Sequence, residues 1–225
     1  MATVMGAAGR FRDRSDAGRR LASLLAAYQQ EEPLVLGLPR GGVVTAFETA
    51  RALRAPLDVL VARKLGAPRQ PEFGVGAIAP GGIRIIDRAS VRSAGMTDAD
   101  LEAVIERERA ELLRREHRYR SGRAPLSVRG RTVILVDDGL ATGVTARAAI
   151  ASLRKLGARR IVLAVGVCAT RAATQLRREV DDLVCVLEPA DMAAVGMYFD
   201  QFDPVSDEEV VALLAAARDS TAVTR

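Results

Sequence analysis

The sequence predicts an α/β fold built on an open parallel sheet, because short aliphatic runs alternate with segments of helical apolar spacing. Strands that are joined through a helix run in the same direction and pair in parallel. The strands are expected at Leu34–Leu38, Leu57–Ala62, Thr132–Val136, Ile161–Val167 and Leu183–Leu187. The helices are expected at Asp13–Gln30, Val43–Leu53, Val144–Leu156, Arg171–Arg178 and Ser206–Ala217.

The middle of the chain departs from this alternation. Phe73–Ala79 and Ile83–Ile86 flank a Pro-Gly-Gly turn, which predicts a β-hairpin. Thr97 begins a helix that is expected to run to about Tyr119, before Ser121-Gly122. Its buried side is expected to hold Leu101, Val104, Ile105, Leu112 and Leu113. We expect one domain over residues 1–225, with a core over about 34–187, an insertion over about 66–121 and a C-terminal segment with a helix over about 188–217.

The composition is typical of a soluble globular protein, with 49% hydrophobic and 27% charged residues in a chain of 225. No apolar stretch reaches the ~18–20 residues that a membrane helix needs. Met1–Phe11 lacks the apolar centre of a secretory signal. We therefore expect a cytoplasmic protein without membrane contacts.

The net charge of +5 does not by itself indicate nucleic-acid binding. Arginines stand beside acidic residues along the expected helices, as in Glu106-Arg107-Glu108-Arg109, which is typical of solvated helix faces. Aromatic residues make up 4% of the chain and offer little surface on which bases could stack. Binding of RNA through arginines is therefore the weakest functional hypothesis.

The two cysteines and the single histidine are too few for a disulfide framework or a zinc site. Cys168 and Cys185 fall in expected strands, where a free cysteine usually packs as a small hydrophobic residue. His117 stands among charged residues of the long helix and is expected to be solvated. No nucleophilic catalytic arrangement can be built around it.

The segment Val133–Ala146 carries the strongest functional signal. A buried strand delivers Asp137 and Asp138 at its carboxyl end, where ligands bind in open α/β sheets. A loop of small and hydroxyl residues follows, and then a helix begins, whose backbone N–H groups favour a phosphate. Carboxylates accept hydrogen bonds from hydroxyl groups. Together these features indicate a ligand with both a phosphate and a vicinal diol.

This segment resembles the signature of the type I phosphoribosyltransferases, which bind 5-phosphoribosyl-1-pyrophosphate (PRPP). The resemblance implies a Rossmann-like sheet of the phosphoribosyltransferase type with a C-terminal hood. It also implies that Asp137 and Asp138 hold the ribose hydroxyls. Asp138 is expected to be exposed, because it lies at a strand end. The 5′-phosphate is then cradled by the loop residues Ala141, Thr142, Gly143 and Thr145. Gly139 is also assigned to the PRPP site, although it departs from the signature, since an aliphatic residue is usual there. Ala141 departs from the oxopurine members, which have an acidic residue at this position.

A second part of the resemblance is the turn after the first strand, where the family keeps its pyrophosphate loop. Pro39, Arg40, Gly41 and Gly42 combine consecutive N–H groups with a guanidinium, which suits a doubly charged leaving group. The family often has a non-proline cis peptide in this loop, so one is expected near Pro39-Arg40. Lys64, at the expected end of the second strand beside Arg63, adds positive charge toward the pyrophosphate.

The C-terminal segment resembles the hood of the oxopurine members. The resemblance implies that Leu183, Val184, Tyr198 and Phe199 border the acceptor. It also implies that Asp200 joins Asp137 and Asp138 at a magnesium ion, which binds with PRPP and which the carboxylates contact directly or through water.

The sequence therefore predicts a magnesium-dependent phosphoribosyltransferase with Arg40, Asp137 and Asp138 as catalytic residues. It would transfer the phosphoribosyl group of PRPP to a nitrogen nucleophile such as a nucleobase and release pyrophosphate. The alternative is a PRPP-sensing regulator without turnover, which the absence of an acid at Ala141 favours. A homodimer is expected, and the acceptor cannot be read from the sequence.

Overall fold

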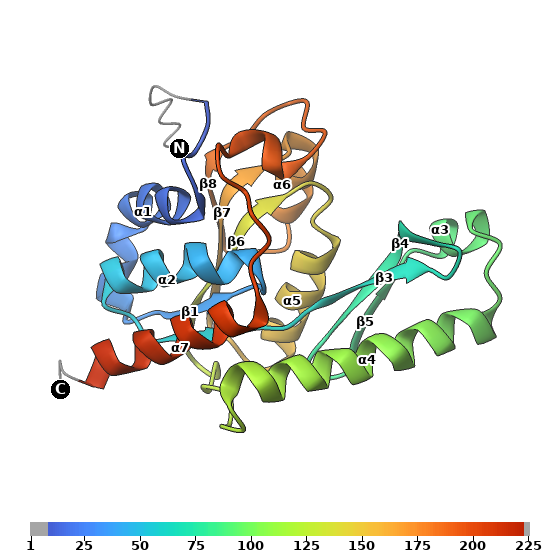
Figure 1. The fold of residues 1–225 in the computed structure, drawn as a ribbon, viewed down its shortest axis with the longest axis horizontal. Helices are drawn as coiled ribbons and strands as arrows, with labels where there is room; N and C mark the ends of the chain where they lie inside the picture. The colour runs from blue at the N-terminus through green and yellow to red at the C-terminus, as the bar shows by residue number, and fades with distance from the viewer. Residues whose placement is uncertain (1–8, 223–225) are drawn as a thin grey trace.

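The computed structural model describes residues 9–222 and is built around a five-stranded parallel sheet in the order β2-β1-β6-β7-β8 (Figure 1). The strands are β1 (Leu34–Gly37), β2 (Leu57–Val59), β6 (Thr132–Leu140), β7 (Arg160–Cys168) and β8 (Asp182–Leu187). The chain leaves β1 toward one edge of the sheet and returns later as β6 on the other side of β1. Ligands bind at such a switch point in open α/β sheets, so the fold singles out the β1–β6 edge.

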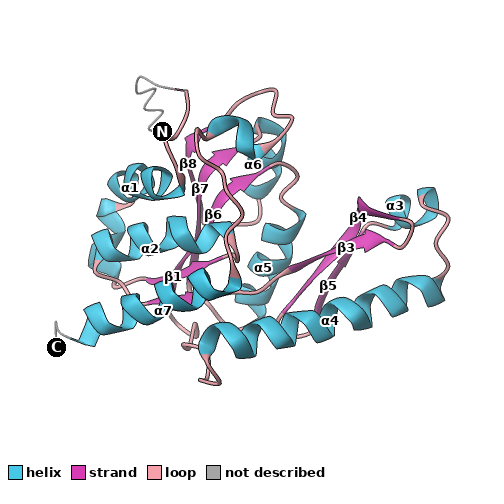
Figure 2. Cartoon of the chain, in the orientation of Figure 1, coloured by secondary structure: helices cyan, strands magenta, loops and turns pink. Residues whose placement is uncertain are grey.

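Helices cover both faces of the sheet (Figure 2). One face carries α1 (Arg14–Leu24), α2 (Gly41–Leu53) and α7 (Asp207–Ala222), which pack with Val35, Ile134 and Val162. The other face carries α5 (Val144–Lys155) and α6 (Thr170–Leu176), which pack with the alternate strand positions. Short 3-10 helices lie at η1 (Ala26–Glu31) and η2 (Val195–Tyr198).

An arm projects from this body and holds the predicted insertion (Figure 1). It consists of an antiparallel sheet, β3 (Arg63–Ala67), β4 (Gln70–Ala79) and β5 (Ile83–Ile86), with α3 (Arg88–Ser93) and α4 (Asp98–Arg120). The arm rests on α5, where the Ser152 hydroxyl donates a 2.8 Å hydrogen bond to the carbonyl of Pro80. The arm is therefore packed against the main body rather than linked to it by the chain alone.

The predicted α/β class, parallel sheet and hairpin are confirmed. The second strand is shorter than predicted and stops at Val59, although residues 60–62 are as buried as the strand. Burial alone could not mark this end, because a buried connection has the same apolar composition as a strand. Arg63 and Lys64 thus begin β3 and do not end β2. The predicted first helix also breaks, since α1 ends at Leu24 and η1 follows.

The predicted start and end of the long helix are confirmed, and the last helix also has a side-chain cap. Thr97 and Asp100 form a reciprocal capping box at the start of α4, and Ser121 ends the helix in a left-handed conformation. At α7 the Ser206 hydroxyl accepts a 3.0 Å hydrogen bond from the backbone N–H of Glu209.

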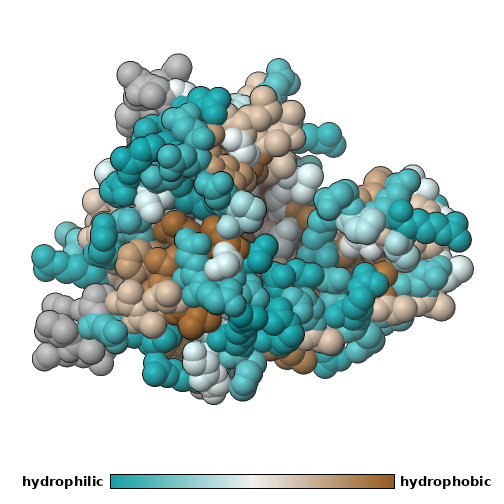
Figure 3. All heavy atoms as spheres, viewed as in Figure 1, coloured by the Kyte–Doolittle hydropathy of each residue, from teal (hydrophilic) through white to brown (hydrophobic). Residues whose placement is uncertain are grey.

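The remaining sequence expectations have mixed outcomes. Cys168 is buried as predicted, whereas Cys185 on the edge strand β8 is half-buried, and His117 is exposed. Figure 3 shows mainly hydrophilic side chains along the arm, and α4 carries pairs such as Arg114–Glu111 rather than a stripe of one sign. No helix within residues 9–222 combines the length and apolar character that crossing a bilayer requires. Residues 1–8 of the predicted non-signal segment Met1–Phe11 lie outside the described part of the chain.

Candidate functional site at the β1–β6 edge

The switch point brings the two predicted loops into contact. Gly37 at the end of β1 pairs with Val136, and the Leu38 N–H donates a 2.9 Å hydrogen bond to the Val136 carbonyl. The next residue of β6 is Asp137, and the chain after Leu38 turns directly into α2. The acidic pair and the Pro-Arg-Gly-Gly turn therefore lie side by side at one edge of the sheet. The predicted cis peptide is confirmed between Pro39 and Arg40.

Glycine is required at both positions of the turn that face the acidic pair. A Cβ on Gly42 would lie 2.8 Å from Asp137 Oδ1 and 2.9 Å from the Val136 carbonyl oxygen. A Cβ on Gly41 would lie 2.9 Å from the carboxyl carbon of Asp138. These two glycines are the first residues of α2, whose N-terminus has no side-chain cap. The start of α2 therefore lies close against the acidic pair, and the unpaired N–H groups of a helix start favour an anion.

Asp137 is the half-buried member of the acidic pair. Its Oδ1 accepts a 2.9 Å hydrogen bond from the backbone N–H of Asp138. Burial, and next the neighbouring charge of Asp138, raise the pKa of the Asp137 carboxyl well above its ordinary value. The ionised form of Asp137 is therefore unfavourable without a partner. A hydroxyl donor or a cation that stabilises this form would interact with it more strongly than with a carboxylate at the surface.

Asp138 is buried, and the prediction that it would be exposed is wrong. Only 9% of the residue is accessible, because the guanidinium of Arg14 on α1 covers its carboxylate. Arg14 Nε donates a 2.6 Å hydrogen bond to Asp138 Oδ2. Sequence reasoning missed Arg14, since residues 124 positions apart share no local pattern. Its only sequence signal is its place at the start of an apolar-periodic helix.

The predicted phosphate cradle follows β6 directly. Gly143 has a φ of 71° and precedes α5, whose N-terminus has no side-chain cap. Ala141 and Thr142 are exposed, and Thr145 is half-buried in the first turn of the helix. The first N–H groups of a helix have no partner within it, and the helix dipole places partial positive charge there. The 141–145 loop thus offers an anion site beside the acidic pair.

The match to known proteins agrees with this geometry. The model of the family described as "Phosphoribosyl transferase domain" matches residues 12–201, a range that includes the acidic pair, the Pro39–Gly42 turn, the 141–145 loop and Arg14. The chain belongs to the phosphoribosyltransferase family.

Individual relatives of this phosphoribosyltransferase-family chain are similar along most of its length. "Putative phosphoribosyl transferase Rv0571c" of Mycobacterium tuberculosis is 46% identical over 207 residues, which are 92% of this chain and 47% of that protein. The chain thus spans about half the length of this relative. "Bifunctional protein PyrR" of Deinococcus deserti is 26% identical over 180 residues, 78% of this chain and 96% of that protein. The crystal structure of TT1426 from Thermus thermophilus has a TM-score of 0.77 and 44% identity, covering 92% of this chain and 98% of that one.

Three basic residues lie near the predicted pyrophosphate loop in the sequence-based assignment, but the structure gives them different partners. Arg40 is partly exposed, and its guanidinium lies 3.9 Å from the carboxylate of Asp207 at the start of α7. Lys64 belongs to the arm sheet, where its ammonium donates a 2.7 Å hydrogen bond to the Glu72 carbonyl. Arg63 is paired with Glu108 of α4. Arg40 is therefore available within the predicted pyrophosphate loop. Lys64 would have to break its hydrogen bond with Glu72 to reach a ligand there.

The hood, the C-terminal segment over about 188–217, runs over the end of β6. Its contacts contradict several of the predicted assignments. Phe199 is 2% exposed and stacks between Phe11 and Phe202, so it closes the core and cannot cover a base. Tyr198 is half-buried, and its hydroxyl donates a 3.1 Å hydrogen bond to the Asp191 carbonyl. Its predicted contact with the acceptor stays a prediction.

Leu183 and Val184 do not lie at the ligand end of the sheet. Through β7 they are level with Leu135 and Val136 on β6, whereas Cys185 is level with Asp137. Their side chains pack into the two sheet-face cores. The error arose because the sequence does not give the register between strands.

Asp200 does not join the acidic pair. It is exposed and pairs at 3.0 Å with Arg10 near the N-terminus, because the N-terminal segment runs beside the hood. Among the described residues, no three His, Cys, Asp or Glu side chains gather as a metal site.

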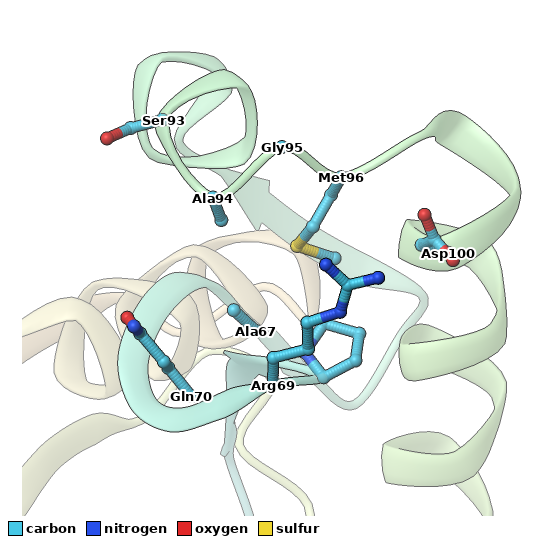
Figure 4. A pocket seen from close by; sticks show the side chains of 9 residues that line it. Ala67, Arg69, Gln70, Ser93, Ala94, Gly95, Met96 and Asp100 are labelled. Carbon is cyan, nitrogen blue, oxygen red and sulfur yellow. The ribbon is translucent and has the colours of Figure 1, made fainter.

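A surface cavity of about 320 Å³ lies elsewhere, at the tip of the arm (Figure 4). It opens between the β3–β4 turn, with Arg69, and the connection from α3 to α4, with Met96. Asp100 on its border is engaged with Thr97 in the helix cap. None of the predicted ligand-binding residues lines this cavity.

Proposed function

We propose that this chain transfers the 5-phosphoribosyl group from PRPP to a nitrogen nucleophile, such as a nucleobase, and releases pyrophosphate. The observation that carries the proposal is the contact between the acidic pair and the Gly41-Gly42 turn. This contact places a carboxylate between two anion-binding helix N-termini, those of α5 and α2. PRPP presents a phosphate, a diol and a pyrophosphate in the same order.

Each part of PRPP has a partner of matching chemistry. The 5′-phosphate is assigned to the 141–145 loop and the first N–H groups of α5. The ribose hydroxyls are assigned to Asp137 and to Oδ1 of Asp138, since Arg14 occupies Oδ2. The pyrophosphate is assigned to Arg40 and to the backbone N–H groups of Gly41 and Gly42.

Magnesium fits this site as a companion of PRPP. It is usually held by one or two carboxylates together with substrate phosphates. This mode of binding suits the β1–β6 edge, which offers Asp137, whereas no cluster of three acidic ligands occurs among the described residues. When bound, the ion would neutralise negative charge on the pyrophosphate. Asp137 is the residue we assign to it, directly or through water.

The reaction breaks the bond from the anomeric carbon to the pyrophosphate oxygen and forms a bond from that carbon to the acceptor nitrogen. Arg40 and the N–H groups of α2 stabilise the charge that the leaving pyrophosphate takes up. The cradle and the acidic pair hold the ribose in place for attack. The proton of the acceptor nitrogen leaves to solvent or to pyrophosphate.

The test is calorimetric titration with PRPP and magnesium, followed by assay of pyrophosphate release across a panel of bases. The wild-type chain should bind PRPP, and Asp137→Asn should weaken binding by at least about tenfold because it removes a charged hydrogen-bond acceptor. Asp98→Asn is the matched control, since Asp98 is an exposed arm residue paired with Arg88. Wild-type protein that fails to bind PRPP would refute the proposal.

The alternative is a PRPP-sensing regulator that does no chemistry. The specific observation in its favour is Ala141, which is exposed in the cradle where the oxopurine members have an acidic residue. Tight PRPP binding without pyrophosphate release for any base in the panel would support this alternative. The homodimer and the cytoplasmic location stay predictions.

A further inference from the structure

Arg14 connects three parts of the candidate site. It is the first residue of α1, and its Nε donates a 2.6 Å hydrogen bond to Asp138 Oδ2. Its Nη1 donates a 2.8 Å hydrogen bond to the carbonyl of Asp203 in the hood. Its guanidinium carbon lies 3.8 Å from the centre of the Phe202 ring. One side chain therefore links the N-terminal helix, the acidic strand and the hood.

This ion pair differs from the many surface pairs of the chain. The side chains of Arg14 and Asp138 are only 12% and 13% exposed, whereas those of Arg10 and Asp200 are 55% and 61% exposed. An exposed pair contributes little to stability, but a buried charge without its partner is strongly unfavourable. Arg14 and Asp138 are therefore held in place by each other.

The pair also forms part of the wall behind the pyrophosphate turn. A Cβ on Gly41 would lie 2.7 Å from Arg14 Nε and 2.9 Å from the carboxyl carbon of Asp138. The guanidinium thus lies next to the backbone that we assign to the leaving group. Arg14 is the basic residue that pairs with Asp138, whereas Arg40 of the turn lies beside Asp207.

We propose that Arg14 is the resident cation of the acidic pair: it positions Asp138 and neutralises its charge, so that the site accepts a phosphorylated ligand. The ligand's identity as PRPP rests on the proposed function. Arg14 acts through Asp138 and is a positioning residue rather than a catalytic one. Because Arg14 already holds Asp138, Asp137 would be the carboxylate left to hold a magnesium ion that binds with the pyrophosphate.

The first test is a double-mutant cycle on PRPP affinity with Arg14→Ala, Asp138→Asn and the double variant. Arg14→Ala should weaken PRPP binding by at least about tenfold, as expected when one member of a buried charge pair is truncated. In the Asp138→Asn background the same change should have little further effect, since there is no charge left to neutralise. Additive losses would mean that Arg14 acts independently of Asp138, and unchanged affinity in Arg14→Ala would overturn the proposal.

Two further variants separate this role from a general structural one. Arg14→Lys keeps the charge but loses the planar fork that reaches both Asp138 and Asp203, so it should recover part of the affinity. Arg20→Ala is the matched control, since Arg20 lies on the same helix, pairs with Asp16 and stacks on Phe11. Its PRPP affinity should equal that of the wild type. Circular dichroism and thermal unfolding establish that each variant is folded.

A second measurement does not depend on PRPP. Titration with Mn²⁺ alone should show weak binding to the wild type and at least about fivefold tighter binding to Arg14→Ala, because two adjacent carboxylates then lack a counter-charge. Equal Mn²⁺ binding would overturn the resident-cation role. If the wild type binds no PRPP, the proposed function fails, and this measurement still decides the role of Arg14.

Discussion

Gly139 shows how closely the hood is fitted to the acidic strand. A Cβ at this position would lie 2.9 Å from a methyl group of Val195 and 3.0 Å from one of Val167. Val195 belongs to η2 in the hood, and it fills the space that an aliphatic side chain at residue 139 would need. The departure of Gly139 from the family signature thus has a packing reason in this chain.

We predict that Gly139→Ala lowers the free energy of unfolding by about 1–3 kcal/mol, the usual effect of overpacking a closely packed site. The measurement is urea denaturation at neutral pH. Adding Val195→Ala to the same chain should restore part of the loss, because it removes the methyl groups that the new Cβ meets. Gly9→Ala is the control, since no atom lies within 4 Å of a Cβ there. A Gly139→Ala protein as stable as the wild type would contradict this packing.

At this scale the sequence predicts residues whose partners are close along the chain. Asp137, Asp138, Gly41 and Gly42 were found because each lies in a short strand–turn–helix string of recognisable chemistry. Arg14 was missed because its role arises only when α1 packs beside β6. The exposure of Asp138 was misjudged for the same reason.

The junction of α4 and α7 connects the arm to the Pro-Arg-Gly-Gly turn. The hydroxyl of Tyr119 donates a 2.7 Å hydrogen bond to Asp207 Oδ1, and Arg118 lies 3.5 Å from Oδ2. Arg40 lies 3.9 Å from the same carboxylate. The hydrogen bond from Tyr119, together with the charges of Arg115, Arg118 and Arg40, lowers the pKa of Asp207, although burial opposes the shift. Asp207 thus joins the end of α4 to the turn that carries Arg40.

We predict that Asp207 stabilises the fold above its unfolded-state pKa of about 3.9, and that this contribution is lost as the pH falls below that value. The sign follows from the direction of the shift, because a lowered pKa in the folded protein favours the charged form. Asp207→Asn should therefore be less stable than the wild type at pH 7, and the difference should be smaller at a pH below about 3.9. Urea denaturation at both pH values measures the difference, and an equal difference at the two values would contradict the prediction.

The limits of α4 were predictable, whereas its buried face was only partly so. Thr97 and Ser121-Gly122 marked its ends through cap chemistry. Leu113 was expected on the buried side but is 54% exposed. The buried side continues instead through Leu112 to Tyr119 and Arg120, which find partners on α7 and β2. A polar residue buried by a distant partner does not appear in an apolar pattern.

For the molecule as a whole, a buried ion pair anchors the arm to the sheet. Arg120 at the end of α4 donates to both carboxylate oxygens of Asp58 on β2, at 3.1 and 3.3 Å. It also donates a 2.6 Å hydrogen bond to the Val59 carbonyl. The side chains of Arg120 and Asp58 are 10% and 9% exposed, so this contact is isolated from water.

We predict that Arg120→Ala lowers the free energy of unfolding by about 3–5 kcal/mol, because it leaves Asp58 buried without its counter-charge. Arg84→Ala removes an exposed pair with Glu102 and should change stability by about 1 kcal/mol or less. Both are measured by urea denaturation. Similar effects of the two substitutions would show that the arm is not held by this contact.

The overall architecture was largely readable from the alternation of apolar runs, because strands linked by helices leave few alternatives to a parallel sheet. The strand β3 was not, because Arg63 and Lys64 directly follow the buried run of residues 57–62 and were assigned to its end. The register of β8 was not either, since it depends on pairing between distant segments. The sequence therefore predicted the two loops of the candidate site. It did not predict how Val195 of the hood packs on Gly139, or that the Arg14 guanidinium contacts Asp138.

The hood is fastened to the segment before α1, and this sets when the site can be completed during synthesis. The N–H of Phe11 donates a 2.7 Å hydrogen bond to the Tyr198 carbonyl, and the Asp200 N–H returns a 2.9 Å hydrogen bond to the Phe11 carbonyl. Contacts between residues so far apart in the chain form late, because a long loop must close first. A nascent chain that has emerged only as far as β8 already holds the acidic strand and both turns to which we assign the phosphates. It still lacks the partners of Phe11, so the candidate site is completed only after the hood has left the ribosome.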